Sequence, residues 1–231
     1  MVVQNYKDRF EGIRSFNQIK VAFEEDKSPV NTTEDPYEKY SLHKSIGKGG
    51  EGKVYLARTK QGEERDYAMK ITNKNDSAMG SRLKEHNLML KINSSYILTA
   101  KEVYDFEGEY FVVSELMSGS LKKFFKVMCR KLSQESCDYM TFIIASAIQD
   151  LHNVNLIHRD LKSENILINE KGKVLVADLG LASVLINNHY RVSSKGTLEF
   201  KAPEMIKGLA YNQSIDSWGL GIIMYDMAFG E

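Results

Sequence analysis

Short runs rich in β-branched and aromatic residues dominate the chain between positions 40 and 115. Turns that carry Gly, Lys and Glu separate five such runs, at 41–46, 54–58, 67–72, 102–106 and 110–114. Runs of this length and composition are typical of β-strands. Between the third and fourth run, residues 81–92 interleave leucines with charges and predict a helix. This part of the chain is therefore expected to be a small β-rich lobe.

After position 115 the hydrophobic pattern changes to helical spacing. Residues 121–128 predict one helix, and residues 134–154 predict a longer one with an apolar stripe on one face. A short strand pair follows at 166–168 and 174–177, around a turn at 170–172. The fold class is therefore α+β, with a β-rich lobe before a mostly helical lobe.

The first 39 residues form a predicted extension or linker. Two of the three prolines of the chain, Pro29 and Pro36, lie in the polar stretch 26–38. Before it, apolar residues recur at three- and four-residue steps between Phe10 and Phe23. This spacing suits a short amphipathic helix, and a mobile extension is the alternative.

The charge balance narrows the class of protein. The 231 residues hold 31 Lys and Arg against 31 Asp and Glu, so the formal net charge is zero. This balance argues against a chain that coats nucleic acid or binds membranes through basic residues. The two cysteines make no disulfide framework, and no run approaches the ~18 apolar residues of a membrane span. We expect a cytoplasmic protein, with a nuclear location left open.

Glycines gather in the segment IGKGGEGKV, between the first two predicted strands. They stand at 47, 49, 50 and 52, and such residues let a backbone approach a phosphate closely. A dinucleotide-binding turn shows the same spacing, but it requires a following helix, whereas a strand follows here. A glycine-rich hairpin tip without a ligand is the alternative.

One lysine lies on an otherwise apolar strand. Lys70 is either a surface residue or is paired with an acid, because burial of an unpaired ammonium is costly. Glu85, on the predicted helix that follows, is the candidate partner.

The segment IHRDLKSENIL carries charged residues between apolar anchors. It supplies Asp160, Lys162 and Asn165, and Asp178 follows the next predicted strand. An acid, a lysine, an amide and a second acid near one hairpin suit metal-assisted phosphoryl transfer. One acid accepts the hydroxyl proton, the lysine neutralises developing charge, and Asn with Asp holds Mg²⁺.

These motifs, in this order, resemble the catalytic domain of eukaryotic serine/threonine protein kinases. The glycine loop, AMK, HRDLKxxN, DLG at 178–180 and APE at 202–204 all follow the family's sequence. The resemblance implies a bilobal fold with a five-stranded antiparallel N-lobe (40–115), a hinge (115–118) and a mostly α C-lobe (119–231). The chain stops where the long central helix of the C-lobe should end, so that lobe is expected to lack its final helices.

The resemblance also implies roles for individual residues. Lys70, paired with Glu85, positions ATP; Asp160 is the catalytic base and Lys162 stabilises the transferred phosphoryl group; Asn165 and Asp178 bind Mg²⁺. The implied nucleotide site consists of Ile46, Gly47, Lys48, Gly49, Gly50, Glu51, Gly52, Lys53, Val54, Ala68, Lys70, Ser114, Glu115, Met117 and Leu167. Ser114 falls at the gatekeeper position, where many kinases carry a larger side chain.

Substrate class and regulation follow from the same resemblance. Lys162 and Thr197 are the pattern of kinases that phosphorylate Ser or Thr on protein substrates. Arg159 suggests control by a phosphate, for which Ser193 or Ser194 would be the acceptor of an activating kinase. The alternative function is a truncated kinase-like scaffold that binds nucleotide or a partner without catalysis.

The C-terminal helix adds one structural expectation. Without the final helices, its apolar residues would lose cover and form an exposed patch. The residues concerned are Trp218, Ile222, Ile223, Met224 and Met227.

Overall fold

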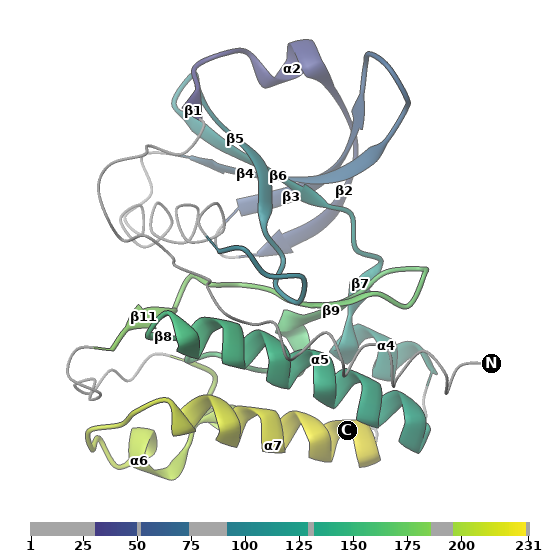
Figure 1. The fold of residues 1–231 in the computed structure, drawn as a ribbon. Helices are drawn as coiled ribbons and strands as arrows, with labels where there is room; N and C mark the ends of the chain where they lie inside the picture. Colours follow the sequence, from purple (N-terminus) through teal and green to yellow (C-terminus); the bar gives the residue numbers. More distant parts are fainter. Residues whose placement is uncertain (1–30, 50–51, 74–91, 129–131, 186–195, 230–231) are drawn as a thin grey trace.

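The computed structural model describes residues 31–49, 52–73, 92–128, 132–185 and 196–229. A twisted sheet lies above a group of helices, and a connection after the sheet's strand β6 leads from one part to the other (Figure 1). The helix predicted near 10–23 lies outside the described residues, and so does the helix predicted at 81–92 except for its last residue. Within the described part of the chain, no helix has the length and apolar character needed to cross a membrane.

The sheet has six strands in the order β1-β5-β6-β4-β3-β2. The five longer strands pair antiparallel, which confirms the predicted five-stranded sheet. They span Tyr40–Gly49 (β2), Gly52–Thr59 (β3), Asp66–Asn73 (β4), Ala100–Phe106 (β5) and Glu109–Glu115 (β6). The sixth, β1 (Asn31–Thr32), pairs parallel with β5 at the sheet's edge.

The segment just before β2 packs on this sheet. The short helix α2 (Pro36–Lys39) is N-capped by Asp35, which accepts the N–H of Tyr37 at 2.8 Å. Glu102 on β5 binds the C-terminal end of this segment. It accepts hydrogen bonds from Lys39 (2.6 Å) and from two tyrosine hydroxyls, those of Tyr40 and Tyr104. The last residues of the predicted linker therefore contact the N-lobe directly.

Strand β6 lies between two hydrophobic cores. Phe111 and Val113 pack in the small core of the sheet, whereas Val112 packs against the larger core of the helical part. Successive side chains of a strand point to opposite faces, so one strand serves both cores. The same alternation directs Ser114 toward the side of Val112, where the sheet faces the helices.

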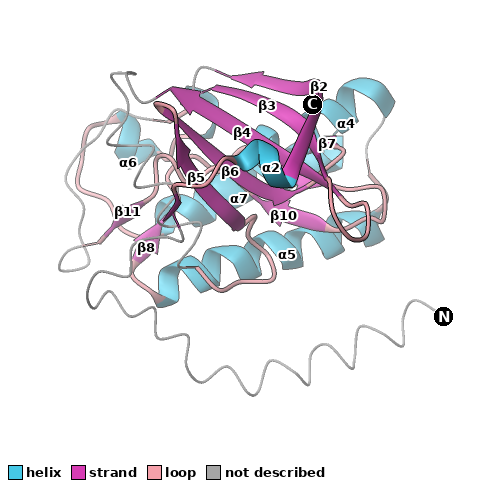
Figure 2. Cartoon of the chain, turned by 90° about the horizontal axis from the view of Figure 1, so that it is seen from above, coloured by secondary structure: helices cyan, strands magenta, loops and turns pink. Residues whose placement is uncertain are grey.

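The helical part is built around α5 (Gln134–Asn153), which is N-capped by Ser133. Helix α4 (Leu121–Met128) precedes it and α7 (Ser214–Phe229) packs beside it, as Figures 1 and 2 show. Two predicted helices are thus confirmed. The expected patch on α7 is only partly present: Trp218 and Met224 are 44% and 45% exposed. The expectation was wrong for Ile223 and Met227, which are fully buried in the core that includes α5.

Short strands and turns complete the helical part. The predicted hairpin is present as β9 (Ile166–Ile168) and β10 (Val174–Val176), with β7 (Gly119–Ser120) as a third strand. A second small sheet joins β8 (Leu156–Ile157) to β11 (Ser183–Val184). Single turns are η2 (Ser163–Asn165), η3 (Leu198–Phe200) and the short helix α6 (Pro203–Ile206).

The hairpin also holds the segment that leads into β5. Val176 donates its N–H to the carbonyl of Tyr96 and accepts the N–H of Leu98, both at 2.8 Å. Nearby, the hydroxyl of Ser94 donates to the buried carboxylate of Asp150 on α5 at 2.6 Å. Residues 94–98 are therefore attached to the helical part rather than to the sheet alone.

Candidate active site

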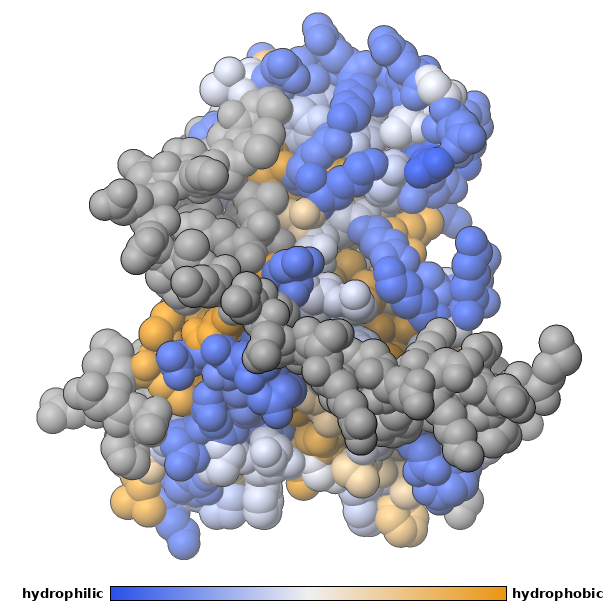
Figure 3. Space-filling model, viewed as in Figure 1, coloured by the Kyte–Doolittle hydropathy of each residue, from blue (hydrophilic) through white to orange (hydrophobic). Residues whose placement is uncertain are grey.

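A cleft of about 1340 Å³ separates the sheet from the helices. In Figure 3 apolar surface shows between the hydrophilic sheet above and the helices below. Both parts supply the walls, and many of the predicted site residues line them. These are Ile46, Gly47, Val54, Ala68, Lys70, Ser114, Glu115, Met117, Asn165, Leu167 and Asp178. Residues predicted from separate motifs are thus brought to one cleft.

Other predicted residues do not line this cleft or are not described. Gly52, Lys53, Asp160 and Lys162 are described and lie outside the cleft lining. Gly50, Glu51 and Glu85 lie outside the described residues, and so do the side chains at positions 48 and 49. The predicted pairing of Lys70 with Glu85 therefore stays a prediction.

The glycine-rich segment forms the tip of the β2–β3 hairpin, where Gly49 pairs with Gly52. Gly52 has φ +142°, and a Cβ there would lie 2.4 Å from the carbonyl oxygen of Ile71 on β4. Only glycine fits this conformation and this approach between two strands. Gly52 therefore has a structural role that the phosphate-loop interpretation alone did not include.

Asp160 lies on the loop after β8 and is only 6% exposed. One carboxylate oxygen, Oδ1, accepts the backbone N–H of Thr197 (2.9 Å) and its hydroxyl (3.1 Å). The other, Oδ2, accepts the ammonium of Lys162 at 2.5 Å. The amide of Asn165 donates to the backbone carbonyl of Asp160 at 2.9 Å. Three contacts thus orient the carboxylate, and the fourth holds the backbone that carries it.

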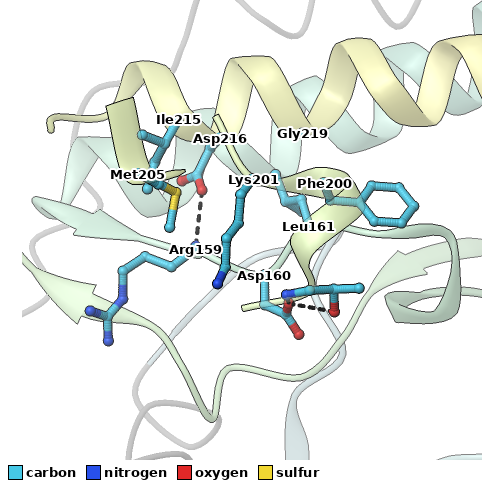
Figure 4. Close-up of a pocket in the computed structure, with 10 residues that line it drawn as sticks. Arg159, Asp160, Leu161, Phe200, Lys201, Met205, Ile215, Asp216 and Gly219 are labelled. Carbon is cyan, nitrogen blue, oxygen red and sulfur yellow. Dashed lines mark hydrogen bonds between the residues drawn. The ribbon is translucent and has the colours of Figure 1, made fainter. Parts of the chain in front are cut away.

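The loop that carries Asp160 is held from below by α7. Asp216, 1% exposed, accepts the backbone N–H groups of His158 (2.9 Å) and Arg159 (3.0 Å). It also contacts Nε2 of His152 at 2.9 Å. Figure 4 shows Asp216 bonded to the backbone of Arg159 beside Asp160. The bonds stabilise Arg159 at φ +69°, a conformation that few non-glycine residues adopt.

Close packing between α7 and the same loop involves a glycine. A Cβ at Gly219 would lie 3.0 Å from Cβ of Leu161, so a larger residue would displace the loop. The cavity left between them, seen in Figure 4, measures about 10 Å³. It has room for at most one water molecule. It is therefore too small for a nucleotide, whereas the large cleft above the loop has the volume for one.

Asn165 and Asp178 come together through the β9–β10 hairpin. The carbonyl of Asn165 accepts the N–H of Ala177 at 2.8 Å, which draws the residue before Asp178 to the end of η2. Asp178 has φ +69°, and its Oδ1 accepts the N–H of Gly180 at 3.2 Å. Both side chains line the cleft. Their carbonyl and carboxylate oxygens are the hard donors that Mg²⁺ prefers.

A metal in this position would have few protein ligands. Within the described ranges, no group of three or more His, Cys, Asp or Glu side chains is placed to hold a metal ion. Mg²⁺ commonly binds through one or two protein oxygens together with phosphate and water oxygens. The two oxygen donors of Asn165 and Asp178 fit that mode.

The hinge is attached to the hairpin beneath it. Glu115, the last residue of β6, accepts hydrogen bonds from Lys173 and, at 3.4 Å, from Asn169. The N–H of Ser118 donates to the carbonyl of Ile168 at 2.9 Å. The sequence-based prediction of a hinge at 115–118 did not include Lys173 and Asn169, because the turn that carries them is 54 to 58 residues away along the chain.

The fold is a sheet connected to a helical part, with a cleft between them. The site holds one fixed carboxylate and two side chains with oxygen donors that suit Mg²⁺. Protein kinases have this arrangement. The family described as the protein kinase domain matches residues 40–231. The chain belongs to this family, which confirms the resemblance and the α+β fold class.

Curated kinases are similar to this protein over most of the chain, among them the serine/threonine-protein kinase named first below. AtPK1/AtPK6 of Arabidopsis thaliana is 34% identical over 83% of this chain and 42% of its own length. Myosin light chain kinase A of Dictyostelium discoideum is 32% identical, over 83% and 66%. Human ribosomal protein S6 kinase alpha-2 is 30% identical, over 83% and 27%. The chain thus spans between about a quarter and two thirds of these relatives.

Proposed function

We propose that this chain is the catalytic part of an ATP-dependent protein kinase that transfers the γ-phosphate to Ser or Thr hydroxyls of proteins. The observation that carries the proposal is the fixed carboxylate of Asp160, which Thr197 and Lys162 hold. Asn165, which lines the cleft, bonds to the backbone of Asp160. Serine/threonine-protein kinases among the relatives support the substrate class.

The proposed chemistry uses the contacts at this carboxylate. Asp160 orients the acceptor hydroxyl and takes its proton as the oxygen bonds to the γ-phosphorus, while the bond from that phosphorus to the β-phosphate oxygen breaks and ADP leaves. Lys162, which contacts both Asp160 and the hydroxyl of Thr197 (3.1 Å), neutralises charge on the transferred group. The fixed geometry replaces the reorganisation that water would require, which is the main protein contribution to phosphoryl transfer.

ATP is proposed to occupy the large cleft. The apolar side chains of Ile46, Val54, Ala68 and Leu167 would enclose the adenine, and the backbone at 115–117 would bond its edge. Lys70, on the cleft wall, would bind the α- and β-phosphates, and Glu85 would pair with Lys70. Mg²⁺, held by Asn165 and Asp178, would neutralise the phosphate oxygens.

Regulation by phosphorylation is a further part of the proposal. Ser193 and Ser194 are the proposed acceptors for an activating kinase, and they lie outside the described residues. Arg159, the expected phosphate partner, already donates from Nε to the carbonyl of Leu181 at 2.6 Å. This bond links the Asp160 loop to the segment that leads toward the two serines.

Phosphate transfer from radiolabelled ATP to a generic basic protein tests the proposal. Wild-type protein is compared with Asp160→Asn, with circular dichroism as the folding control and a fluorescent ATP analogue as the binding probe. Transfer well above the Asp160→Asn background is expected. Folded protein that binds the analogue without transfer would reject catalysis and favour the scaffold alternative.

A further inference from the structure

Helix α7 runs beneath the catalytic loop and contacts it at successive positions. Asp216 binds the backbone at residues 158 and 159, and Gly219 packs against Leu161. Asp226 then accepts a hydrogen bond from the hydroxyl of Ser163. Helical positions 3 and 10 residues apart fall on one side of a helix with 3.6 residues per turn. The contacts therefore form one continuous face that follows the loop.

The last contact fixes the start of η2, the turn that ends at Asn165. Ser163 is 2% exposed, so its hydroxyl depends on a protein partner. Lys162, the residue before the turn, provides no side-chain cap. Asp226, from a helix 63 residues further along the chain, thus supplies the side-chain anchor that the local sequence lacks.

The middle residue of η2 is held from a different helix. Lys122, on the first turn of α4, donates to Glu164 at 2.5 Å. Hydrogen bonding and charge from Glu164 raise the pKa of Lys122, and the charges of Glu199 and Asp226 add to this. Lys122 is therefore electrostatically coupled to both Glu164 and Asp226.

The third residue, Asn165, is oriented by its neighbours in the site. Its side-chain N–H donates to the carbonyl of Asp160 at 2.9 Å, and its own carbonyl accepts the N–H of Ala177 at 2.8 Å. Each residue of η2 is thus held by a different part of the molecule. A shift at Ser163 would move Asn165 relative to Asp160, because only one residue separates them along a tight turn.

We propose that Ser163 and Asp226 form a positioning pair for the proposed kinase reaction: Asp226 holds Ser163, and the anchored turn sets Asn165 against Asp160. Neither residue acts on substrate itself. The inference rests on the proposed function where it treats Asn165 as a ligand of Mg²⁺. Residues that orient a metal ligand typically affect metal affinity or activity by about 10- to 100-fold.

The test uses small changes at Ser163 with a matched serine on α7. Ser163→Ala removes the donor, Ser163→Thr keeps it, and Asp226→Ala removes the acceptor. Ser217→Ala, at an exposed position of the same helix, is the control. Each variant is measured for unfolding in urea, for Mg²⁺-dependent binding of a fluorescent ATP analogue, and for kcat and KM.

We expect Ser163→Ala to raise the Mg²⁺ concentration for half-maximal analogue binding about tenfold and to lower kcat about tenfold. KM for the protein substrate should stay unchanged, and Ser163→Thr and Ser217→Ala should resemble wild type. In Mg²⁺ dependence and kcat, the Ser163→Ala/Asp226→Ala double variant should match Asp226→Ala, because both changes remove the same Ser163–Asp226 contact.

Three results would overturn the pair. These are an unchanged Mg²⁺ dependence in Ser163→Ala, additive effects in the double variant, and an Asp226→Ala effect confined to KM for the protein substrate. If Asp226→Ala fails to fold, the Mg²⁺ dependence of Ser163→Ala compared with that of Ser163→Thr still tests the proposed pair. If wild type binds the analogue but transfers no phosphate, the proposed function fails, while the binding and unfolding measurements still test the pair.

Discussion

Thr197 donates two hydrogen bonds to the same oxygen of Asp160, one from its backbone N–H at 2.9 Å and one from its hydroxyl at 3.1 Å. Because Lys162 engages the other oxygen, the carboxylate cannot rotate without breaking a contact. The segment before α6 and the loop after β8 are therefore joined at the proposed catalytic base.

The hydroxyl of Thr197 is expected to be required for full activity. Thr197→Val removes its bonds to Asp160 and Lys162 but leaves the backbone bond in place. Hydrogen bonds to charged groups contribute about 1.5 to 3 kcal/mol, so kcat/KM should fall by about 10- to 150-fold. Thr197→Ser keeps a hydroxyl and should retain most activity. Equal losses in the valine and serine variants, measured by steady-state kinetics, would contradict this role.

Asp216 is expected to be important for stability. Asp216→Ala would leave two backbone N–H groups without their acceptor at a site that is 1% exposed. Removing one member of a buried charged contact typically costs about 3 to 5 kcal/mol of unfolding free energy. Asp216→Asn keeps one acceptor oxygen and should lose less. Urea denaturation measures both; an unchanged midpoint for Asp216→Ala would refute the role assigned to this anchor.

Ser114 should allow bulky inhibitors into the cleft. Its small side chain lies between Ala68 and Ala100 on the neighbouring strands, at the cleft wall. A pyrazolopyrimidine with a bulky aromatic group is expected to inhibit the wild type. Overpacking typically costs about 1 to 3 kcal/mol, so Ser114→Met should weaken inhibition by about 5- to 150-fold. A wild type that resists the compound, or equal inhibition of both proteins, would exclude an open back pocket.

Asp150 predicts a pH dependence of stability. Burial raises the pKa of this carboxyl, and the hydrogen bond from Ser94 only partly opposes the rise. The folded state therefore holds the proton more tightly than the unfolded state, in which the pKa is about 3.9. This contribution to stability is complete below about pH 4 and is lost as the pH rises through the folded-state pKa.

Asp150→Asn tests this sign, because asparagine has no charge to bury and can still accept from Ser94. The free energy of unfolding of the variant, minus that of the wild type, should become more positive between about pH 4 and pH 7. Urea titrations at several pH values in this interval measure the difference. A difference that shrinks with rising pH would show that the charged form is favoured in the fold.

Most regular elements could be predicted because their signals are local. Strands β2 to β6 and helices α4 and α5 follow periodicities that a short window contains. The edge strand β1 and the helix α2 were missed because they have no such periodicity. They have two and four residues, too few for a periodic pattern, and they lie in a stretch with linker composition. Their position depends on contacts with β5, about 70 residues later.

The chain's residue types and motif order determined the family and the residues that meet in the cleft. Tertiary structure alone decided which groups each acid contacts. Asp160, Asp216 and Asp226 carry the same group, yet the first is bound by Lys162 on its own loop, whereas the other two bind that loop from α7. A carboxylate's role depends on its partners, and those of the two α7 acids are more than 50 residues away. Such partners come together only when α7 packs beneath the loop, and no pattern within a short stretch of sequence predicts that packing.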